Sequence, residues 1–181
     1  MENLISPQLD IPISELENIF FNAYSKESSG DPIGRKEYGI RDWYQCGSSA
    51  FVFAAIVDNS KIMRQKVGVI DPSKELRDCF TRNETKKRTL KHYKTILSDG
   101  QQIDFTKNQL NYWWELAFGD ETIVDLPVKE VANFIQDYGS EFLQRCEILK
   151  ANVIKEMSYV FCCPPKDIEE YLKTQKFTLL V

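Results

Sequence analysis

The sequence contains a single histidine, His92, and this scarcity excludes two kinds of chemistry. Metal centres built from several imidazoles and phosphotransfer centres with two histidines both need a second one. The five cysteines are odd in number and irregularly spaced, so they do not form a disulfide framework. The adjacent Cys162 and Cys163 lack the two-residue spacers of a zinc site. We therefore expect no metal, no cofactor and no disulfide.

Long apolar runs and an export signal are also missing from the sequence. No apolar run approaches the roughly 20 residues that cross a bilayer. Residues 1–10 lack the basic and apolar regions of a signal peptide. Gly30, Gly34 and Gly39 do not have the spacing of a phosphate-binding loop. We therefore expect a cytoplasmic protein with no membrane partner.

The composition is that of a folded chain of ordinary size. With 181 residues, of which 43% are hydrophobic and 28% charged, the sequence is typical of one globular domain. We expect a single α+β domain over residues 1–181. A flexible loop is expected near 25–39, where three glycines and a proline interrupt the pattern.

Capping patterns and apolar spacing predict the helices. Ser14 and Glu17 form a capping box, and apolar residues follow at helical spacing. A second capping box at Thr106 predicts a helix that carries Trp114 and ends at Gly119. The other predicted helices cover residues 71–80, 128–139, 142–160 and 166–175.

Runs of β-forming residues predict strands at 51–57, 62–70, 95–97 and 103–105. A turn-prone triplet joins the first two strands, and a loop that contains Gly100 joins the last two as a hairpin. We expect an α+β fold in which an antiparallel sheet of about four strands is combined with an N-terminal helix. A C-terminal group of three to four helices is expected to pack on one face of the sheet.

The chain is acidic, with a net charge of −4, but residues 82–94 are strongly basic. This stretch contains six Lys or Arg, one Glu and the only histidine. Cations beside an aromatic ring are typical of sites that bind phosphates and stack on bases. The candidate partner- or phosphate-binding residues are Arg82, Lys86, Lys87, Arg88, Lys91, His92, Tyr93 and Lys94.

The secondary structure of this basic stretch decides whether its charges share a surface. On a strand they divide between two faces, whereas on a helix Lys87, Arg88, Lys91 and Lys94 lie on one side. The residue types and the loop that follows favour the strand over residues 86–97. The simplest alternative to a binding site is a solvated edge strand, because lysine at sheet edges discourages unwanted pairing.

Three functions remain open. We favour a non-catalytic intracellular protein that binds an acidic protein partner through the basic patch, because charge steering needs only a local patch. A nucleic-acid-binding module is the first alternative, although such domains are usually basic overall. A small hydrolase or nuclease with His92 as general base is the second. The surrounding cations are expected to lower the pKa of His92, and only Glu84 and Asp99 are carboxylates close to it in sequence.

Residues 45–51 (QCGSSAF) are similar to the segment around the nucleophile of papain-type cysteine proteases. The similarity places Ser49 at the nucleophile position and Ala50 at the following aromatic position, so the family pattern is not met. A dyad of Cys46 and His92 on an unrelated fold is a further alternative, because such pairs are recognised by geometry. No third residue that would orient His92 is evident, and Cys46 is most simply a core residue.

Overall fold

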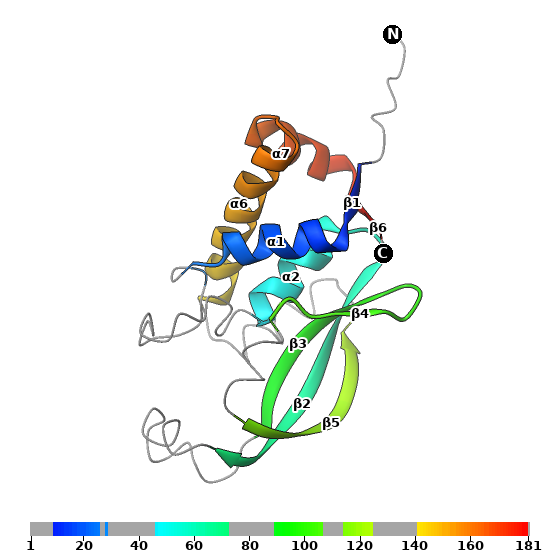
Figure 1. The fold of residues 1–181 in the computed structure, drawn as a ribbon, viewed down its shortest axis with the longest axis vertical. Coiled ribbons are helices and arrows are strands. Elements are labelled where there is room, and N and C mark those ends of the chain that lie inside the picture. The colour runs from blue at the N-terminus through cyan, green and yellow to red at the C-terminus, as the bar shows by residue number, and fades with distance from the viewer. Residues whose placement is uncertain are drawn as a thin grey trace.

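The computed structural model describes residues 9–25, 28, 46–72, 89–106, 114–124 and 141–180. The helices gather at one end of the molecule and a twisted antiparallel sheet lies at the other (Figure 1). Helices and strands are therefore combined in one chain, which confirms the mixed α and β class. None of the helices in these ranges has both the length and the apolar character needed to cross a bilayer.

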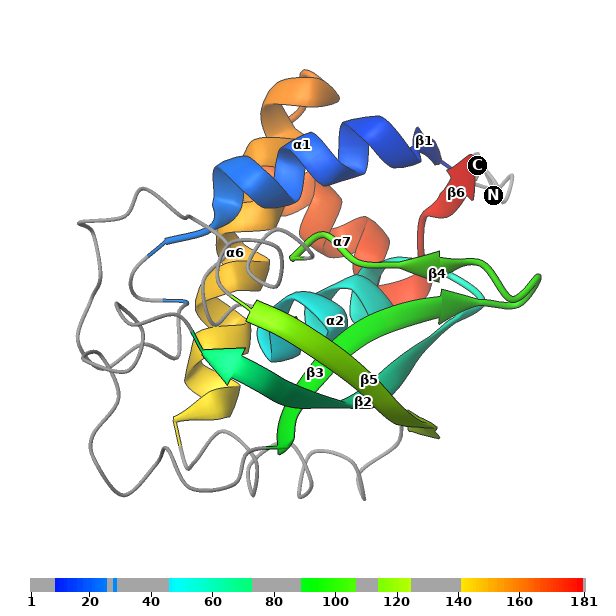
Figure 2. The same ribbon diagram turned by 60° about the horizontal axis from the view of Figure 1, so that its bottom comes forward.

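The helical layer is organised around a long helix near the C-terminus. The layer contains four described helices, α1 (Ile13–Ala23), α2 (Cys46–Ile56), α6 (Phe142–Val160) and α7 (Pro165–Thr174), and α6 is the long one. Helix α6 packs against α1, α2 and α7, and α2 also packs against the sheet. Helix α2 therefore lies between α6 and the strands (Figure 2).

The sheet consists of three long antiparallel strands and one short edge strand. These are β2 (Ser60–Pro72), β3 (Thr89–Leu97), β5 (Trp114–Val124) and the two-residue β4 (Gln102–Ile103). Their order is β4-β3-β2-β5, and each neighbouring pair is antiparallel. The sheet therefore has three full strands where about four were expected, and the predicted strand at 62–70 and the hairpin around Gly100 are confirmed.

The segment 51–57, which the sequence predicts to be a strand, lies almost wholly in helix α2. A short apolar run fits a buried helix as well as a buried strand, so periodicity does not distinguish them. Helix α2 is apolar around its circumference because α6 covers one side and the sheet the other. Phe53, Ala54 and Ile56 are at most 1% exposed.

The predicted helix that begins at Thr106 is also wrong over its second half. Residues Trp114–Phe118 belong to strand β5, which pairs with β2 from Pro72↔Trp114 to Ile62↔Val124. The segment is rich in β-branched and aromatic residues, which favour strands. Pairing with β2 therefore overrides the helical spacing. Residues 107–113, which form the first half of the predicted helix, lie outside the described residues, and the Thr106 hydroxyl donates to Asp104.

The remaining helix predictions have mixed outcomes. Helices α1, α6 and α7 confirm the predictions that begin at Ser14, 142 and 166. The capping box at Ser14 is not used, because α1 begins after Pro12 and no side chain caps it. Asp71 and Pro72, predicted to open a helix, end strand β2. Residues 73–80 and 128–139, and most of the predicted loop at 25–39, lie outside the described residues.

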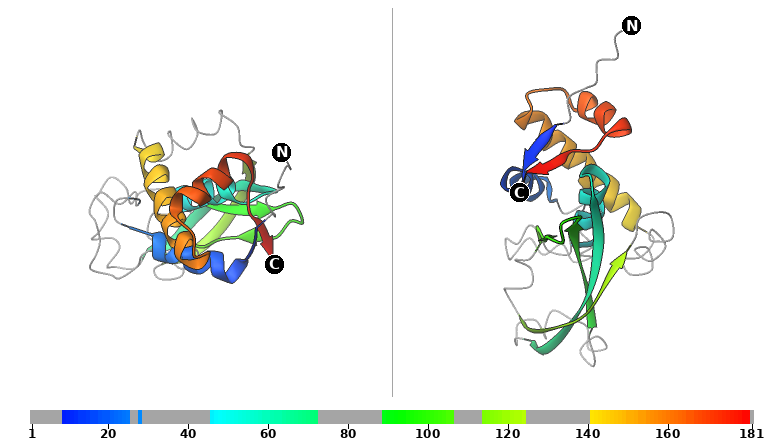
Figure 3. Two further views of the ribbon diagram at one scale, coloured as in Figure 1. Left: turned by 90° about the horizontal axis from the view of Figure 1, so that it is seen from above. Right: turned by 90° about the vertical axis from the view of Figure 1, so that its right-hand side faces the viewer.

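A small parallel sheet joins the two ends of the described chain. Strand β1 (Asp10–Pro12) pairs in register with β6 (Thr178–Leu180), and the two strands lie side by side in Figure 3. The backbone of Phe177 bonds to both Ile56 and Asp58, so the C-terminal segment also holds the end of α2. The C-terminal segment thus holds the end of helix α2, which packs on α6 on one side and on β3 on the other.

Candidate active site

Cys46 is the first residue of helix α2 and is 7% exposed. A helix N-terminus carries a partial positive charge and backbone N–H groups without partners in the helix. Both features stabilise a thiolate relative to a thiol. Cys46 lies in the hydrophobic core, as the sequence predicts, and its place at the start of the helix also suits a reactive cysteine.

His92 lies on β3, and the hairpin that follows brings Asp104 to it. The turn at Gly100 has φ +91°, a conformation that favours glycine. Thr95 pairs with Ile103, so Asp104 comes alongside the residues that precede Thr95. His92 Nε2 lies 2.6 Å from Oδ2 of Asp104, and the two side chains are 4% and 18% exposed. An ionised carboxylate only accepts hydrogen bonds, so Nε2 is the donor.

The Cys46 side chain also lies near enough to the imidazole to interact with it, and this interaction raises the pKa of His92. Because Nε2 is bonded to Asp104, Nδ1 is the ring nitrogen that remains for the sulfur. Three side chains from α2, β3 and the segment after β4 therefore form one chain of contacts, Cys46 to His92 to Asp104. A thiol, an imidazole and a carboxylate in this order are the three side-chain types of a cysteine-type triad, which is recognised by geometry.

The electrostatics of His92 favour the imidazolium. Burial lowers its pKa, but the hydrogen bonds to Asp104 and Cys46 and their negative charges outweigh burial and raise the pKa from 6.5 to about 10. The expectation that nearby cations would lower this pKa is therefore wrong. That expectation considered only charges close to His92 in sequence. The carboxylate that raises the pKa of His92 belongs to Asp104, which is 12 residues away.

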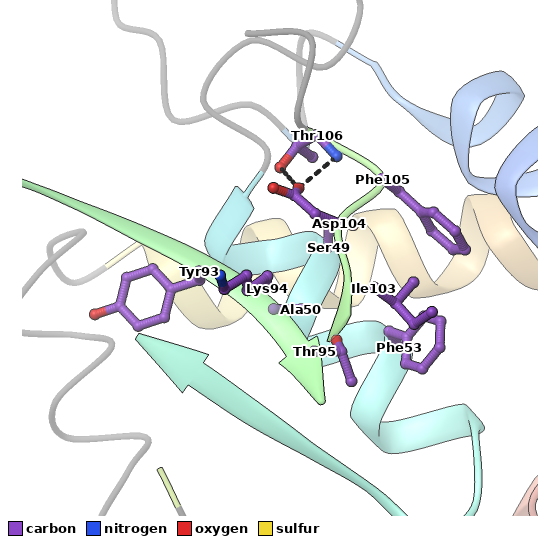
Figure 4. A pocket seen from close by; sticks show the side chains of 10 residues that line it. All are labelled: Ser49, Ala50, Phe53, Tyr93, Lys94, Thr95, Ile103, Asp104, Phe105 and Thr106. Atoms are coloured by element: carbon purple, nitrogen blue, oxygen red, sulfur yellow. Dashed lines mark hydrogen bonds between the residues drawn. The ribbon is translucent and has the colours of Figure 1, made fainter. Parts of the chain in front are cut away.

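Asp104 remains ionised despite its burial. Burial raises its pKa, but the hydrogen bonds and charge of His92, with two bonds from Thr106, outweigh this effect and lower the pKa below the ordinary 3.8. Thr106 donates from its backbone N–H at 2.9 Å and from its hydroxyl at 3.0 Å, both to Oδ1 of Asp104 (Figure 4). The carboxylate thus divides its oxygens between Thr106 and His92.

Lys94, two residues along β3 from His92, is half-buried and lines the same small pocket as Asp104. Gln65 of β2 lies directly opposite His92 in the strand pairing and is 7% exposed. Cys46 from α2 and Asp104 from the hairpin are the titratable groups that bind the ring. A small pocket lies between α2 and the segment of Asp104, and its volume of about 10 Å³ suffices for one water molecule.

The structure describes only part of the basic stretch. Arg82, Lys86, Lys87 and Arg88 lie outside the described residues. Lys91 lies on β3, so the preference for a strand is confirmed at residues 89–97. His92 and Tyr93 are buried, and a ring that is 1% exposed, as Tyr93 is, offers no surface for a base. Binding of an acidic partner or nucleic acid through this stretch stays a prediction.

Sequence reasoning considered the pair of Cys46 and His92 but missed Asp104. A usable signal was present in the predicted hairpin. A hairpin turn at Gly100 necessarily returns the chain along β3, so the acid just after its second strand lies near His92. No arrangement of three or more His, Cys, Asp or Glu that could hold a metal occurs in the part of the chain described.

No family model, curated protein or solved structure matches this chain. Its function must therefore be inferred from the geometry of its own residues.

Proposed function

We propose that this protein is a cysteine-dependent hydrolase that cleaves an ester, thioester or amide through an acyl-enzyme intermediate. Cys46 is the nucleophile, His92 the general acid and base, and Asp104 the residue that orients His92. The observation that carries the proposal is the 2.6 Å contact of His92 with Asp104, together with the nearby Cys46 side chain, whose interaction raises the pKa of His92. Triads of this kind recur on unrelated folds and are recognised by geometry and role.

In the first half of the reaction, Cys46 attacks the substrate. The thiolate sulfur bonds to the carbonyl carbon, and the electron pair of the carbonyl bond moves onto oxygen. His92 then gives its Nδ1 proton to the leaving alcohol, thiol or amine as the bond to that group breaks. The carbonyl re-forms as a thioester to Cys46, and the leaving group departs in its neutral form.

In the second half, water removes the acyl group. Neutral His92 takes a proton from the water as its oxygen bonds to the thioester carbonyl. The C–S bond then breaks, Cys46 leaves as the thiolate, and the acid is released. The imidazolium and thiolate are restored together, so the cycle returns to the ion pair that the raised pKa of His92 favours.

The N-terminus of α2 supports the oxyanion that forms in both steps. The backbone N–H groups of Cys46 and Gly47 belong to the first turn of the helix, and the partial positive charge of that turn favours a negative oxygen. Donors aimed at a developing oxyanion stabilise the transition state, and losing one typically slows the reaction by about 10²–10³-fold. The nucleophile and the proposed oxyanion donors thus come from the same turn.

Acyl-enzyme trapping tests this proposal. The protein is mixed with p-nitrophenyl acetate, release of nitrophenol is followed, and the acetylated residue is located by peptide mass spectrometry. An exposed thiol such as Cys162 can be acetylated without the triad, so Cys162→Ser is introduced into every protein used in this trapping experiment. We expect a burst of nitrophenol and an acetyl group on Cys46, with both lost in Cys46→Ala. Equal acetylation of Cys46 with His92→Gln in place would refute the triad.

A further inference from the structure

Thr106 makes an unusual pair of contacts with the proposed triad. Its backbone N–H and its hydroxyl both donate to Oδ1 of Asp104, at 2.9 and 3.0 Å. The other carboxylate oxygen, Oδ2, accepts from His92. Thr106 itself is 1% exposed, so its hydroxyl points into the protein.

These two bonds fix the torsion about which the Asp104 carboxylate turns. The carboxylate of an aspartate rotates about a broad, two-fold torsion, so nothing in the side chain itself aims one oxygen at His92. Two donors converging on Oδ1 hold that oxygen at Thr106 and leave Oδ2 towards the imidazole. Because they donate to a carboxylate, they also favour its ionised form, which accepts the Nε2–H bond.

The arrangement has a consequence at the sulfur. The Nε2–H bond to Asp104 holds that nitrogen at the carboxylate and leaves Nδ1 as the ring nitrogen for Cys46, whose interaction raises the pKa of His92. A residue that touches neither the substrate nor the thiol can therefore change the reactivity of Cys46 through Asp104.

We propose that Thr106 is the positioning residue of this site, holding the Asp104 carboxylate so that His92 presents Nδ1 to Cys46. This inference rests on the proposed function. Thr106 acts through Asp104 and is not itself a catalytic residue.

Two variants separate positioning from mere packing. Thr106→Val keeps the branched shape and the backbone N–H bond but removes the hydroxyl donor. Thr106→Ser keeps both donors and removes only a methyl group. A packing role alone would make the valine variant resemble the original protein and the serine variant differ from it, whereas a positioning role predicts the reverse.

The single histidine provides the readout. In protein labelled with ¹⁵N-histidine, His92 gives the only imidazole signals, and their pH dependence is followed in the untagged chain. We expect Thr106→Val to shift the titration of His92 downward by about one pH unit, because a carboxylate that is no longer held in place supports the imidazolium less well. Thr106→Ser should shift it by much less.

Each outcome of this titration is decisive. If the pKa of His92 is raised in the original protein and Thr106→Val does not change it, the positioning role is overturned and the triad remains. A titration of His92 near 6.5 in the original protein overturns both the proposed function and the positioning role. If Thr106→Val does not fold, the test uses Thr106→Ser alone. A folded serine variant in which the pKa of His92 is as low as in Asp104→Asn contradicts the inference.

Discussion

Nε2 of His92 lies 2.6 Å from Oδ2 of Asp104, and both side chains are largely buried. The two residues are 12 positions apart, on the two arms of the hairpin that turns at Gly100. Backbone pairing within this hairpin holds the two residues near each other. Cys46 belongs to a separate helix, so its position depends on how α2 packs against β3. The most sensitive part of the site is thus the contact between α2 and β3.

Replacing Asp104 with asparagine tests the role of the carboxylate. The amide keeps the size of the side chain but removes the charge that holds the imidazolium and its tautomer. We expect the acylation rate in single-turnover experiments with p-nitrophenyl acetate to fall roughly 10²–10⁴-fold.

The control for this variant is Asp99→Asn, which changes an acid at the exposed tip of the same hairpin. It should retain the acylation rate of the original protein. Equal rates for Asp104→Asn and the original protein would remove Asp104 from the mechanism.

The raised pKa of His92 makes the stability of the fold depend on pH. A histidine whose pKa rises from 6.5 to about 10 on folding stabilises the protein fully below pH 6.5, and this contribution is lost as the pH rises towards 10. We expect the urea midpoint of His92→Gln to lie furthest below that of the original protein at about pH 6, with the gap closing towards about pH 10.

Lys173→Gln provides the comparison for these midpoints. Lys173 forms an ion pair with Glu170 at 2.6 Å on the exposed face of α7. A pair in water contributes little, so this variant should follow the original protein across the same pH range. A gap for His92→Gln that widens as the pH rises would contradict the raised pKa.

The triad could be predicted from the sequence only in pieces. Cys46, His92 and the hairpin were each recognisable, but the sequence did not show that they meet. Residues 51–57 have a strand-like composition, and only the covering of both sides by α6 and the sheet makes them a helix with Cys46 at its start. Strand β5 likewise depends on pairing with β2, a long-range contact that local spacing cannot reveal.

Phe105 connects the triad to the helical core. It lies between Asp104 and Thr106 in sequence, and its ring packs against Phe20 at 5.2 Å and Phe53 at 5.5 Å between centroids. We expect Phe105→Leu to destabilise the protein by about 1–3 kcal/mol and to slow acylation of Cys46, because the segment that carries Asp104 loses its anchor.

Phe161→Leu is the matched control for this anchor. Phe161 is also half-buried and stacks on one phenylalanine, Phe177, at 5.6 Å, but it lies at the end of α6. It should lower the unfolding free energy by a similar amount and leave the acylation rate of the folded protein unchanged. Equal rate losses in the two variants would indicate a general loss of packing.

The central claim, that His92 activates Cys46, is tested most directly by the alkylation rates of the two cysteines Cys46 and Cys162. Both are measured in one protein by iodoacetamide labelling and peptide mass spectrometry, with exposed Cys162 as the internal reference for the buried Cys46. We expect the ratio of the Cys46 rate to the Cys162 rate to rise as the pH falls from about 9 to about 6, because an imidazolium neighbour preserves the thiolate. This rise should disappear in His92→Gln; a ratio that stays constant or falls in the original protein would contradict the claim.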